Sequence, residues 1–326
     1  MFKRNAEISA CLMVALLAGI VCPPAGAAEY PSKAIRVVTG YAAGGPNDIV
    51  ARALAQKFTE RWGQPAIVEN RPGADGVIGA DFVAKSPADG YMLLLASPAH
   101  AIKNPQTVQL PFDPVKSFAP VSQVASGPII LVIHPSVPAR TAAQLIALAK
   151  ARPGQLTYAS SGTGGSLHLA GELFKSIARV DIIHVPYKGA APATMDVVGG
   201  QVHIMFSNTL TALPQIKNGR LRALAVSAEK RLPAAPEVPT FAESGLPTFE
   251  VTIWQGLLAP AGTPAAIVEK LSAEVARVVQ LPDMREKFAS LGSDPVGSSP
   301  KQFTAFLEAE IAKYTRIIRE ANLRLD

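Results

Sequence analysis

Cysteine is almost absent from the chain, and the two that occur, Cys11 and Cys22, lie close to its N-terminus. Two basic residues there precede an apolar run at 10–21, and a group of small residues follows it. This order is typical of a secretory leader, so residues 1–27 are predicted to be a signal peptide. The mature chain then has no thiol, and we expect neither a disulfide nor a cysteine metal site in it.

Long apolar runs and clusters of basic residues are also lacking beyond the leader. Without an apolar run of membrane-spanning length we expect no membrane helix. The formal charge of +6 falls to +5 when Lys3, Arg4 and Glu7 are removed with the leader, and the remaining basic residues are scattered. The sequence therefore contains no cluster of basic residues that would indicate a nucleic-acid partner. About 300 residues remain, which is enough for two domains that each bury a core.

The signatures of common hydrolases are missing as well. The sequence contains no GxSxG nucleophile elbow, no HExxH zinc motif and no Walker loop. His168 and Glu172 have the i, i+4 spacing of two metal ligands on a helix, but no third ligand accompanies them. His203 lies in an apolar strand pattern that is typical of a core histidine. We therefore expect no catalysis, no metal and no cofactor; a secreted α/β hydrolase is the alternative, because α/β folds host catalysis readily.

The stretch 35–54 predicts a strand, a glycine-rich loop and a helix. If Gly45 is the N-cap, Pro46 occupies the first helical position, where its missing N–H costs nothing. Asp48 then occupies the third position, where a carboxylate favours the helix dipole. The N–H groups from Gly44 to Asp48 would point at one small volume and attract an anion. We interpret this loop as half of a carboxylate-binding site; an ordinary turn between a strand and a helix is the alternative.

Strand and helix patterns alternate along the rest of the chain, which indicates an α/β fold with mostly parallel sheets flanked by helices. Prolines interrupt the alternation at 104–123 and at 233–247. We interpret both stretches as crossings between two lobes. One lobe is expected to comprise residues 28–124 and 250–326, and the other residues 125–249. Two crossings of this kind permit hinge closure over a ligand.

Two further loops carry groups suited to a ligand. The loop from Ser160 to Ser166 offers backbone N–H groups and four hydroxyls at a helix start, and a flexible connection is the alternative. The stretch 184–200 adds Tyr187 as an aromatic platform and Lys188 as a cation beside another helix start. The structural alternatives are a Tyr187 ring packed in the core and a Lys188 side chain solvated at the surface.

Four motifs give the sequence a specific resemblance. After the leader it contains, in order, GYAAGGPNDIVARALA, YASSGTGGSLHLAGELFK, HVPYKGAAPATMDVVGGQVHIMF and WQGLLAPAGTP. Over essentially the whole mature chain it resembles the Bug family, the TctC-like substrate-binding receptors of tripartite tricarboxylate transporters. The resemblance implies a two-lobed periplasmic-binding-protein fold of the Venus flytrap type that resides in the periplasm and is not an enzyme. It also implies a small organic acid held by backbone amides and ordered water, and a two-subunit inner-membrane transporter as partner; a monomer is the default expectation.

The resemblance places the ligand-binding residues in the three loops and at strand ends. They are Tyr41, Ala42, Gly44, Gly45, Asn47 and Asp48 in the first loop, Ser161, Gly162, Thr163, Gly164 and His168 in the second, Tyr187, Lys188, Gly189 and Ala190 in the third, and Ser97, His100 and Asn208 at strand ends. Asp48 has a structural alternative, since an acid at that position stabilises a helix start. A receptor for another importer type would use a buried arginine, for which Arg52 is the nearest candidate. The sequence departs from the usual family pattern at Ala43, where proline is frequent, and at Lys103.

Overall fold

The computed structural model describes residues 30–103, 109–249, 251–290 and 292–320, apart from the side chain of residue 320. Residues Lys33–Asp326 cluster as one compact unit, and all elements below belong to it. The predicted signal peptide, with both cysteines, lies outside the described residues, and so does residue 250, the expected start of one lobe segment.

Three parallel strands and one antiparallel strand form the first part of the sheet. β1 (Ile35–Thr39) lies between β2 (Ala66–Asn70) and β3 (Met92–Ala96), and β9 (Thr252–Pro260) runs antiparallel to β3. The helices of this part are α2 (Pro46–Trp62), α3 (Val77–Ala84), α4 (Ala99–Ile102), α9 (Ala265–Val279), α10 (Pro282–Ser290) and α11 (Pro300–Glu320), with the 3-10 turn η1 (Ala74–Gly76).

Three parallel strands also form the second part of the sheet. β5 (Thr157–Ser160) lies between β6 (Ile183–Pro186) and β7 (Ile204–Asn208). The remaining elements of this part are α5 (Ala142–Ala151), α6 (Ser166–Ala178), α7 (Ala190–Val198), α8 (Thr209–Lys217) and the strand β8 (Arg222–Val226).

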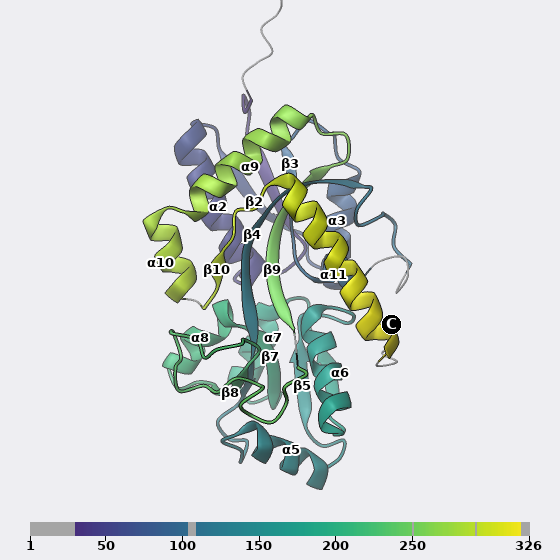
Figure 1. The fold of residues 1–326 in the computed structure, drawn as a ribbon, viewed down its shortest axis with the longest axis vertical. Helices are drawn as coiled ribbons and strands as arrows, with labels where there is room; N and C mark the ends of the chain where they lie inside the picture. The colour runs from purple at the N-terminus through teal and green to yellow at the C-terminus, as the bar shows by residue number, and fades with distance from the viewer. Residues whose placement is uncertain (1–29, 104–108, 250, 291, 321–326) are drawn as a thin grey trace, which may run out of the picture. The chain divides into compact units, whose positions relative to one another are not determined.

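One long strand, β4 (Phe118–Ile133), joins the two parts. Its first section pairs with β9 and with the short β10 (Asp294–Pro295), whereas its last section pairs with β7 and β8. The result is a single mixed sheet in the order β2-β1-β3-β9-β4-β7-β5-β6, with β8 and β10 also paired to β4. Figure 1 shows β4 and β9 side by side between the helices of the two parts.

Parallel pairing is confirmed within β1 to β3 and within β5 to β7, but β4, β8 and β9 all pair antiparallel. Because β4 carries the chain out of the first part and β9 carries it back, these two neighbours must run in opposite directions. The alternation of strands and helices does not reveal this, since it predicts only the strands that follow a crossover helix. The expected crossing at 104–123 is partly strand, because β4 begins at Phe118.

We propose that the two lobes divide where β4 changes partner. Pro128 pairs with Thr252 of β9, and the next residue, Ile129, pairs with Asn208 of β7. The Ile129 N–H also donates to Ser227 Oγ at 2.8 Å. These positions lie close to the expected boundaries after residues 124 and 249.

Each part of the sheet is covered by its own hydrophobic core. In the first part Trp254 and the α11 side chains Phe303 and Tyr314 are buried together, which confirms that the last helix packs there through residues at helical spacing. The Trp254 indole N–H donates to Glu310 at 2.9 Å, so its polar atom is satisfied inside this core. In the second part residues 129–133 of β4 are fully buried among apolar side chains.

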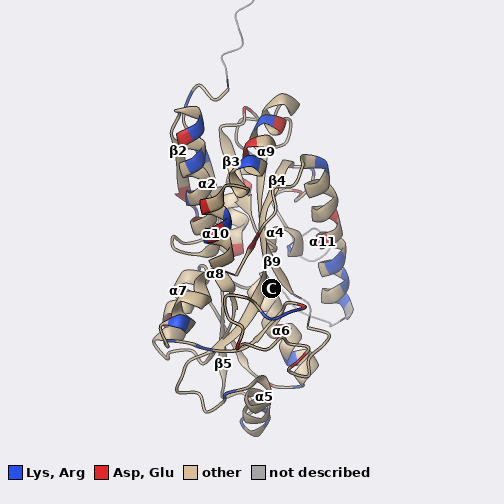
Figure 2. Cartoon of the chain, turned by 60° about the vertical axis from the view of Figure 1, so that its left-hand side comes forward, with Lys and Arg blue, Asp and Glu red and all other residues tan. Residues whose placement is uncertain are grey.

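Charged residues of both signs are interspersed on the helices, as Figure 2 shows for α2 and α9. On α2, Arg52 pairs with Asp48 and Lys57 pairs with Glu60. Neighbouring opposite charges offset each other, so the positive excess is not concentrated on that helix. Among the residues that the structure describes, no helix has both the length and the apolar character needed to cross a bilayer.

The contact between Gly256 of β9 and Phe303 of α11 gives a prediction about stability. A Cβ at Gly256 would lie 2.1 Å from the Phe303 ring, so Gly256→Ala should push α11 away and lower the free energy of unfolding by about 1–3 kcal/mol, the usual cost of overpacking. Urea unfolding measures the change. Gly199→Ala is the matched control, because a Cβ there meets no atom closer than 3.4 Å. Equal losses in both variants would show that this contact does not determine the packing.

Candidate functional site

The first glycine loop leads from β1 into α2. α2 begins at Pro46 with Gly45 as its N-cap, which confirms the predicted helix start. The N–H groups of Asn47 and Asp48 lie in the first turn, where no intrahelical acceptor exists, whereas Pro46 has no N–H to offer. The helix start therefore offers a ligand the N–H groups of Asn47 and Asp48 but none from Pro46.

Asp48 has the structural role that was the alternative to ligand binding. Its Oδ2 accepts from the Gly44 N–H at 3.0 Å and from Arg52 Nε at 2.8 Å, and its Oδ1 accepts from Asn70 Nδ2 at 3.0 Å. Burial raises the pKa of Asp48, but hydrogen bonds from Arg52, Gly44 and Asn70 outweigh burial and hold it below its ordinary value. The Gly44 amide, predicted to face a ligand, is therefore occupied by the protein itself.

The second glycine loop repeats this arrangement at the start of α6. Gly165 is the N-cap, and the Gly164 N–H donates to His168 Nδ1 at 2.9 Å, four residues further on. The Gly162 N–H donates to Ser160 Oγ at 3.2 Å. Two of the amides predicted to receive a ligand are thus used inside the loop. The first-turn amides from Ser166 to His168 lack an intrahelical acceptor.

His168 accepts a hydrogen bond from the second loop, at Gly164, and does not line either of the two cavities described below. Its ring stacks on His184 with centroids 4.0 Å apart, and His184 Nε2 lies 2.6 Å from Ser160 Oγ. Burial lowers the pKa of His168, and burial together with the neighbouring His168 lowers the pKa of His184 to about 4. Both rings are therefore neutral near pH 7, and the prediction that His168 contacts a ligand directly is not supported.

The metal alternative also finds little support at His168. Its Nε2 lies 3.9 Å from Glu172 Oε1, and that oxygen already accepts from the Tyr158 hydroxyl and from Lys175. Within the described ranges no three His, Cys, Asp or Glu side chains come together as a metal site requires.

A small cavity brings helix starts from both parts of the sheet together. Six of the predicted residues line it, namely Tyr41, Asn47, Ser97, Ser161, Ala190 and Asn208. The first residues of α2, α6 and α7 and the N-cap of α8 all border this cavity, so their amide ends converge on one volume of about 30 Å³. Helix starts carry partial positive charge and attract anions. No lysine or arginine is among the described residues that line this cavity, so backbone and neutral polar groups define the chemistry of that lining.

Five residues of the same cavity were not predicted. Pro46, Pro98, Ser166, Leu167 and Ile253 also line it. Pro46, Ser166 and Leu167 are the first residues of helices that sequence patterns do locate, so helix-start position is a signal that could have identified them. Ile253 belongs to β9, and its approach depends on the crossing back between the two parts.

A larger cavity of about 430 Å³ adjoins the small one, since Tyr41 and Ser161 line both. The third loop borders it through Tyr187 and Lys188, and the second loop borders it through Gly162 and Thr163. The Tyr187 hydroxyl donates to Asp196 at 2.7 Å, so its polar atom is satisfied locally. The Lys188 side chain is exposed. This cavity is large enough to hold a small organic molecule.

Ala42, Gly45 and Gly189 lie where the first and third loops meet. A Cβ at Gly189 would lie 3.2 Å from the Ala42 nitrogen, and one at Gly45 would lie 4.0 Å from the Ala191 nitrogen. Gly189 has a φ of 131°, which side chains rarely adopt. These residues therefore allow close approach of two backbone segments, and they line neither cavity.

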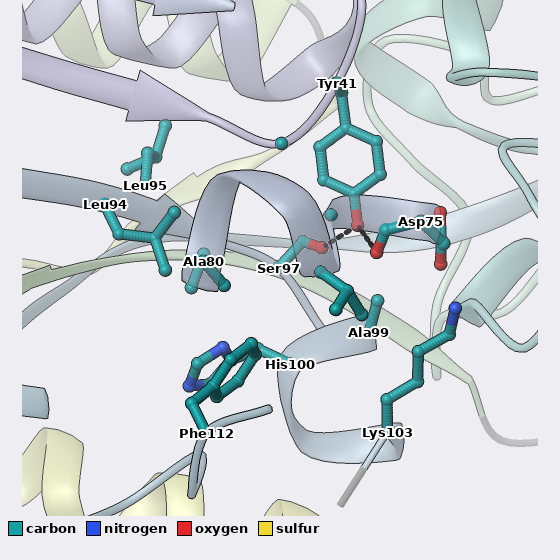
Figure 3. Close-up of a pocket in the computed structure, with 14 residues that line it drawn as sticks. Tyr41, Asp75, Ala80, Leu94, Leu95, Ser97, Ala99, His100, Lys103 and Phe112 are labelled. Carbon is teal, nitrogen blue, oxygen red and sulfur yellow. Dashed lines mark hydrogen bonds between the residues drawn. The ribbon is translucent and has the colours of Figure 1, made fainter. Parts of the chain in front are cut away.

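His100 lines the pocket drawn in Figure 3 together with Tyr41, Ser97 and Lys103, but neither of the two cavities above, and its contact with a ligand stays a prediction. Its Nε2 is hydrogen-bonded to the Pro114 carbonyl at 2.8 Å, and its ring lies between Phe112 and Phe118. Burial lowers its pKa to about 4, so the ring is neutral. Ser97, by contrast, reaches the Tyr41 hydroxyl at 2.7 Å, and that hydroxyl also donates to the Asp75 carbonyl at 3.2 Å (Figure 3).

Comparison with known proteins gives a consistent set of relatives. Residues 50–323 match the model of the tripartite tricarboxylate transporter family receptor, TctC. BugT of Bordetella pertussis is 37% identical over 94% of this chain and 94% of its own length. A Rhodopseudomonas palustris protein solved with adipate is 36% identical, with a TM-score of 0.88 over 91% of this chain and 99% of that one. MatC from the same organism, solved with bound malate, is 31% identical, with a TM-score of 0.84 over 89% of this chain and all 100% of that one.

The contacts of Asp48 predict how stability depends on pH. Asp48→Asn should lower the free energy of unfolding near pH 7 by about 1–2 kcal/mol, since it weakens three hydrogen bonds to a carboxylate. Because the folded-state pKa is below the ordinary value, this stabilisation is present above that ordinary value and is lost as the pH falls through the folded pKa. Wild type and variant should therefore converge below about pH 4 in urea unfolding.

Arg52→Ala serves as the control for Asp48→Asn. It removes only the partner whose side chain is 58% exposed, so it should change stability by less than about 1 kcal/mol. A loss in Asp48→Asn that stays constant down to pH 3 would contradict the ionic origin of the effect.

Proposed function

Because the chain belongs to the tripartite tricarboxylate transporter receptor family, we propose that it captures a small organic carboxylate between its two lobes for uptake by a two-subunit inner-membrane transporter. The observation that carries the proposal is the convergence of the α2, α6, α7 and α8 starts on one cavity, whose described lining contains no lysine or arginine. Such a cavity can receive an anion only through helix ends, amides and neutral polar side chains. This supports an amide cradle over the arginine clamp of another importer type.

The first-turn amides of α2 and α6 are the donors that suit a carboxylate in the small cavity, because they lack intrahelical acceptors. The Tyr41 and Ser161 hydroxyls already donate to the carbonyl and the carboxylate of Asp75. Ser97 is hydrogen-bonded to Tyr41 and would have to turn to donate to a ligand. One carboxylate of the ligand would lie in the small cavity, and its other end would extend past Tyr41 and Ser161 into the larger cavity beside Tyr187 and Lys188. The adipate and malate bound to the related proteins are acids of suitable size.

Hinge closure is the second part of the proposal. The small cavity, about 30 Å³, accommodates one or two water molecules, so a larger ligand enters only if the lobes separate. β4 and β9 are the strands that run between the lobes, and the change of partner at Pro128 and Ile129 is the natural place for bending. A ligand that touches both lobes favours the closed form, which lets a membrane partner distinguish loaded from empty receptor.

The remaining features of the proposal follow from this role. We propose that residues 1–27 direct secretion to the periplasm, that the receptor acts as a monomer, and that it is not an enzyme. Ser160 Oγ and His184 Nε2 have the spacing of a hydrolase dyad, at 2.6 Å. Ser160 is fully buried, however, and its hydroxyl also donates to the Gly162 carbonyl, so it is not available to attack a substrate. Turnover of an ester or amide panel that is abolished by Ser160→Ala would revive the hydrolase alternative.

Asn208→Asp tests the amide cradle. Asn208 Oδ1 accepts from the Leu210 N–H at 2.7 Å as the α8 N-cap, and aspartate caps equally well, so the fold should persist. The new negative charge in the small cavity should weaken carboxylate binding by about tenfold or more, which corresponds to about 1.4 kcal/mol. Calorimetry with mono- and dicarboxylates of four to eight carbons, including adipate and malate, measures the loss.

Thr141→Asp is the matched control for the charge at Asn208. Thr141 is the N-cap of α5 and accepts from the Gln144 N–H, but it does not line the cavity. It should leave affinity unchanged. Wild-type affinity in Asn208→Asp, or binding of none of the acids by the wild type, would overturn the proposed function.

A further inference from the structure

The Asp75 carboxylate lies against the second glycine loop from the other part of the sheet. Its Oδ1 accepts from the Ser161 hydroxyl at 3.1 Å. A Cβ at Gly165 would lie 1.7 Å from Asp75 Oδ2, and a Cβ at Gly162 would lie 3.0 Å from Asp75 Cβ. The glycines of this loop therefore leave space that the Asp75 side chain fills. The protein places one of its own carboxylates at the start of α6.

This carboxylate is buried and only partly satisfied. Asp75 is 6% exposed, and in the described part of the chain its Oδ2 has no hydrogen-bond partner. Its backbone has a φ of 50°, in the left-handed region that aspartate, asparagine and glycine tolerate best. Burying a carboxylate oxygen without a partner costs free energy. We therefore expect a hydrogen-bond donor or a cation nearby to offset this cost.

Lys103 provides the opposite charge. It is 8% exposed, and its Nζ donates to the carbonyl of Ala74, the residue before Asp75, at 2.8 Å. Figure 3 shows the Lys103 side chain extended toward Asp75. Asp75 and Lys103 both line the 430 Å³ cavity in which the distal end of the ligand would lie. The buried pair therefore contributes no net charge to that cavity while both groups are ionised.

We propose that Asp75 is a specificity-determining residue that compensates Lys103 and so favours an acid whose distal end is uncharged or carries an ammonium over a dicarboxylate. This inference rests on the proposed function. With Asp75 ionised, a distal carboxylate meets no unbalanced positive charge from the pair, whereas a distal ammonium is attracted by the Asp75 charge at the wall of the cavity. Without the Asp75 charge, Lys103 is left to attract a second carboxylate.

We call this preference for an uncharged or ammonium distal end the charge rule. Adipate, hexanoate and 6-aminohexanoate test it, because they share a six-carbon chain and differ at the distal end. In calorimetry Asp75→Asn should raise the affinity for adipate relative to 6-aminohexanoate by at least tenfold over the wild-type ratio. Lys103→Met, the reciprocal variant, should shift the ratio in the opposite direction. Asp75→Gly should act as Asp75→Asn does, and it suits the left-handed backbone if asparagine disturbs the fold.

The pH dependence of the same ratio separates a charge effect from a structural one. Burial raises the pKa of Asp75 to about 6, although Lys103 and Ser161 act to lower it. Between pH 7.5 and 5.5 most of the Asp75 charge is lost. The second carboxyl of adipate also begins to gain a proton toward pH 5.5, because the first negative charge raises its pKa, but this changes the ratio alike in wild type and Asp75→Asn. The wild-type ratio divided by the Asp75→Asn ratio should therefore rise toward pH 5.5. Tyr41, Lys103 and Lys188 also line this cavity, and His168 lies close enough to sense the Lys103 charge, but both proteins contain all four residues.

The outcomes distinguish this inference from the proposed function. If the acids bind but the three variants leave the ratio within twofold of the wild type, the role of Asp75 is wrong and the receptor function stands. If none of the acids binds to the wild type or to any variant, the proposed function is wrong, and the charge rule falls with it.

Discussion

The first-turn amides of the helices that start at the cleft are the constraint on which the rest of the site depends. An α-helix leaves these donors without intrahelical partners, and burying them unpaired is costly. Each glycine loop satisfies one nearby amide in the same way. Gly44 donates to the side chain of Asp48, and Gly164 donates to the side chain of His168, each four residues further on. The remaining first-turn residues of the two loops then border the same small cavity.

The two strands that carry the chain between the lobes set how those amides can move. β4 and β9 pair with each other along most of β9, so the lobes share a continuous piece of sheet. A sheet bends most easily where it has the fewest backbone hydrogen bonds between strands. Pro128 has no backbone N–H and lies where β4 changes partner, so we expect bending there. Closure would thus rotate one set of helix starts toward the other and leave each core intact.

Much of the fold was predictable, because the periodicity of the apolar residues locates the helices and the parallel strands. The start of α2 at Pro46 and the apolar face of α11 are confirmed. The antiparallel course of β4 and β9 was not predictable, since it depends on the direction in which the chain crosses between lobes. The three loops were identified, yet which of their amides are free was not. That depends on acceptors such as His168, whose role a count of loop amides does not reveal.

Asp75 is the clearest example of a contact between distant residues that the sequence pattern does not predict. In the sequence it is one polar residue of a glycine-rich turn, and its contact with Ser161 joins positions 86 residues apart. Asp48 lies at the first glycine loop and Asp75 at the second, so the starts of α2 and α6 each already have a protein carboxylate beside them. These carboxylates lower the positive potential that the amides alone would produce. In the proposed receptor, the balance between helix ends and internal acids would therefore select the charge of the ligand, and the amide geometry would select only its carboxylate end.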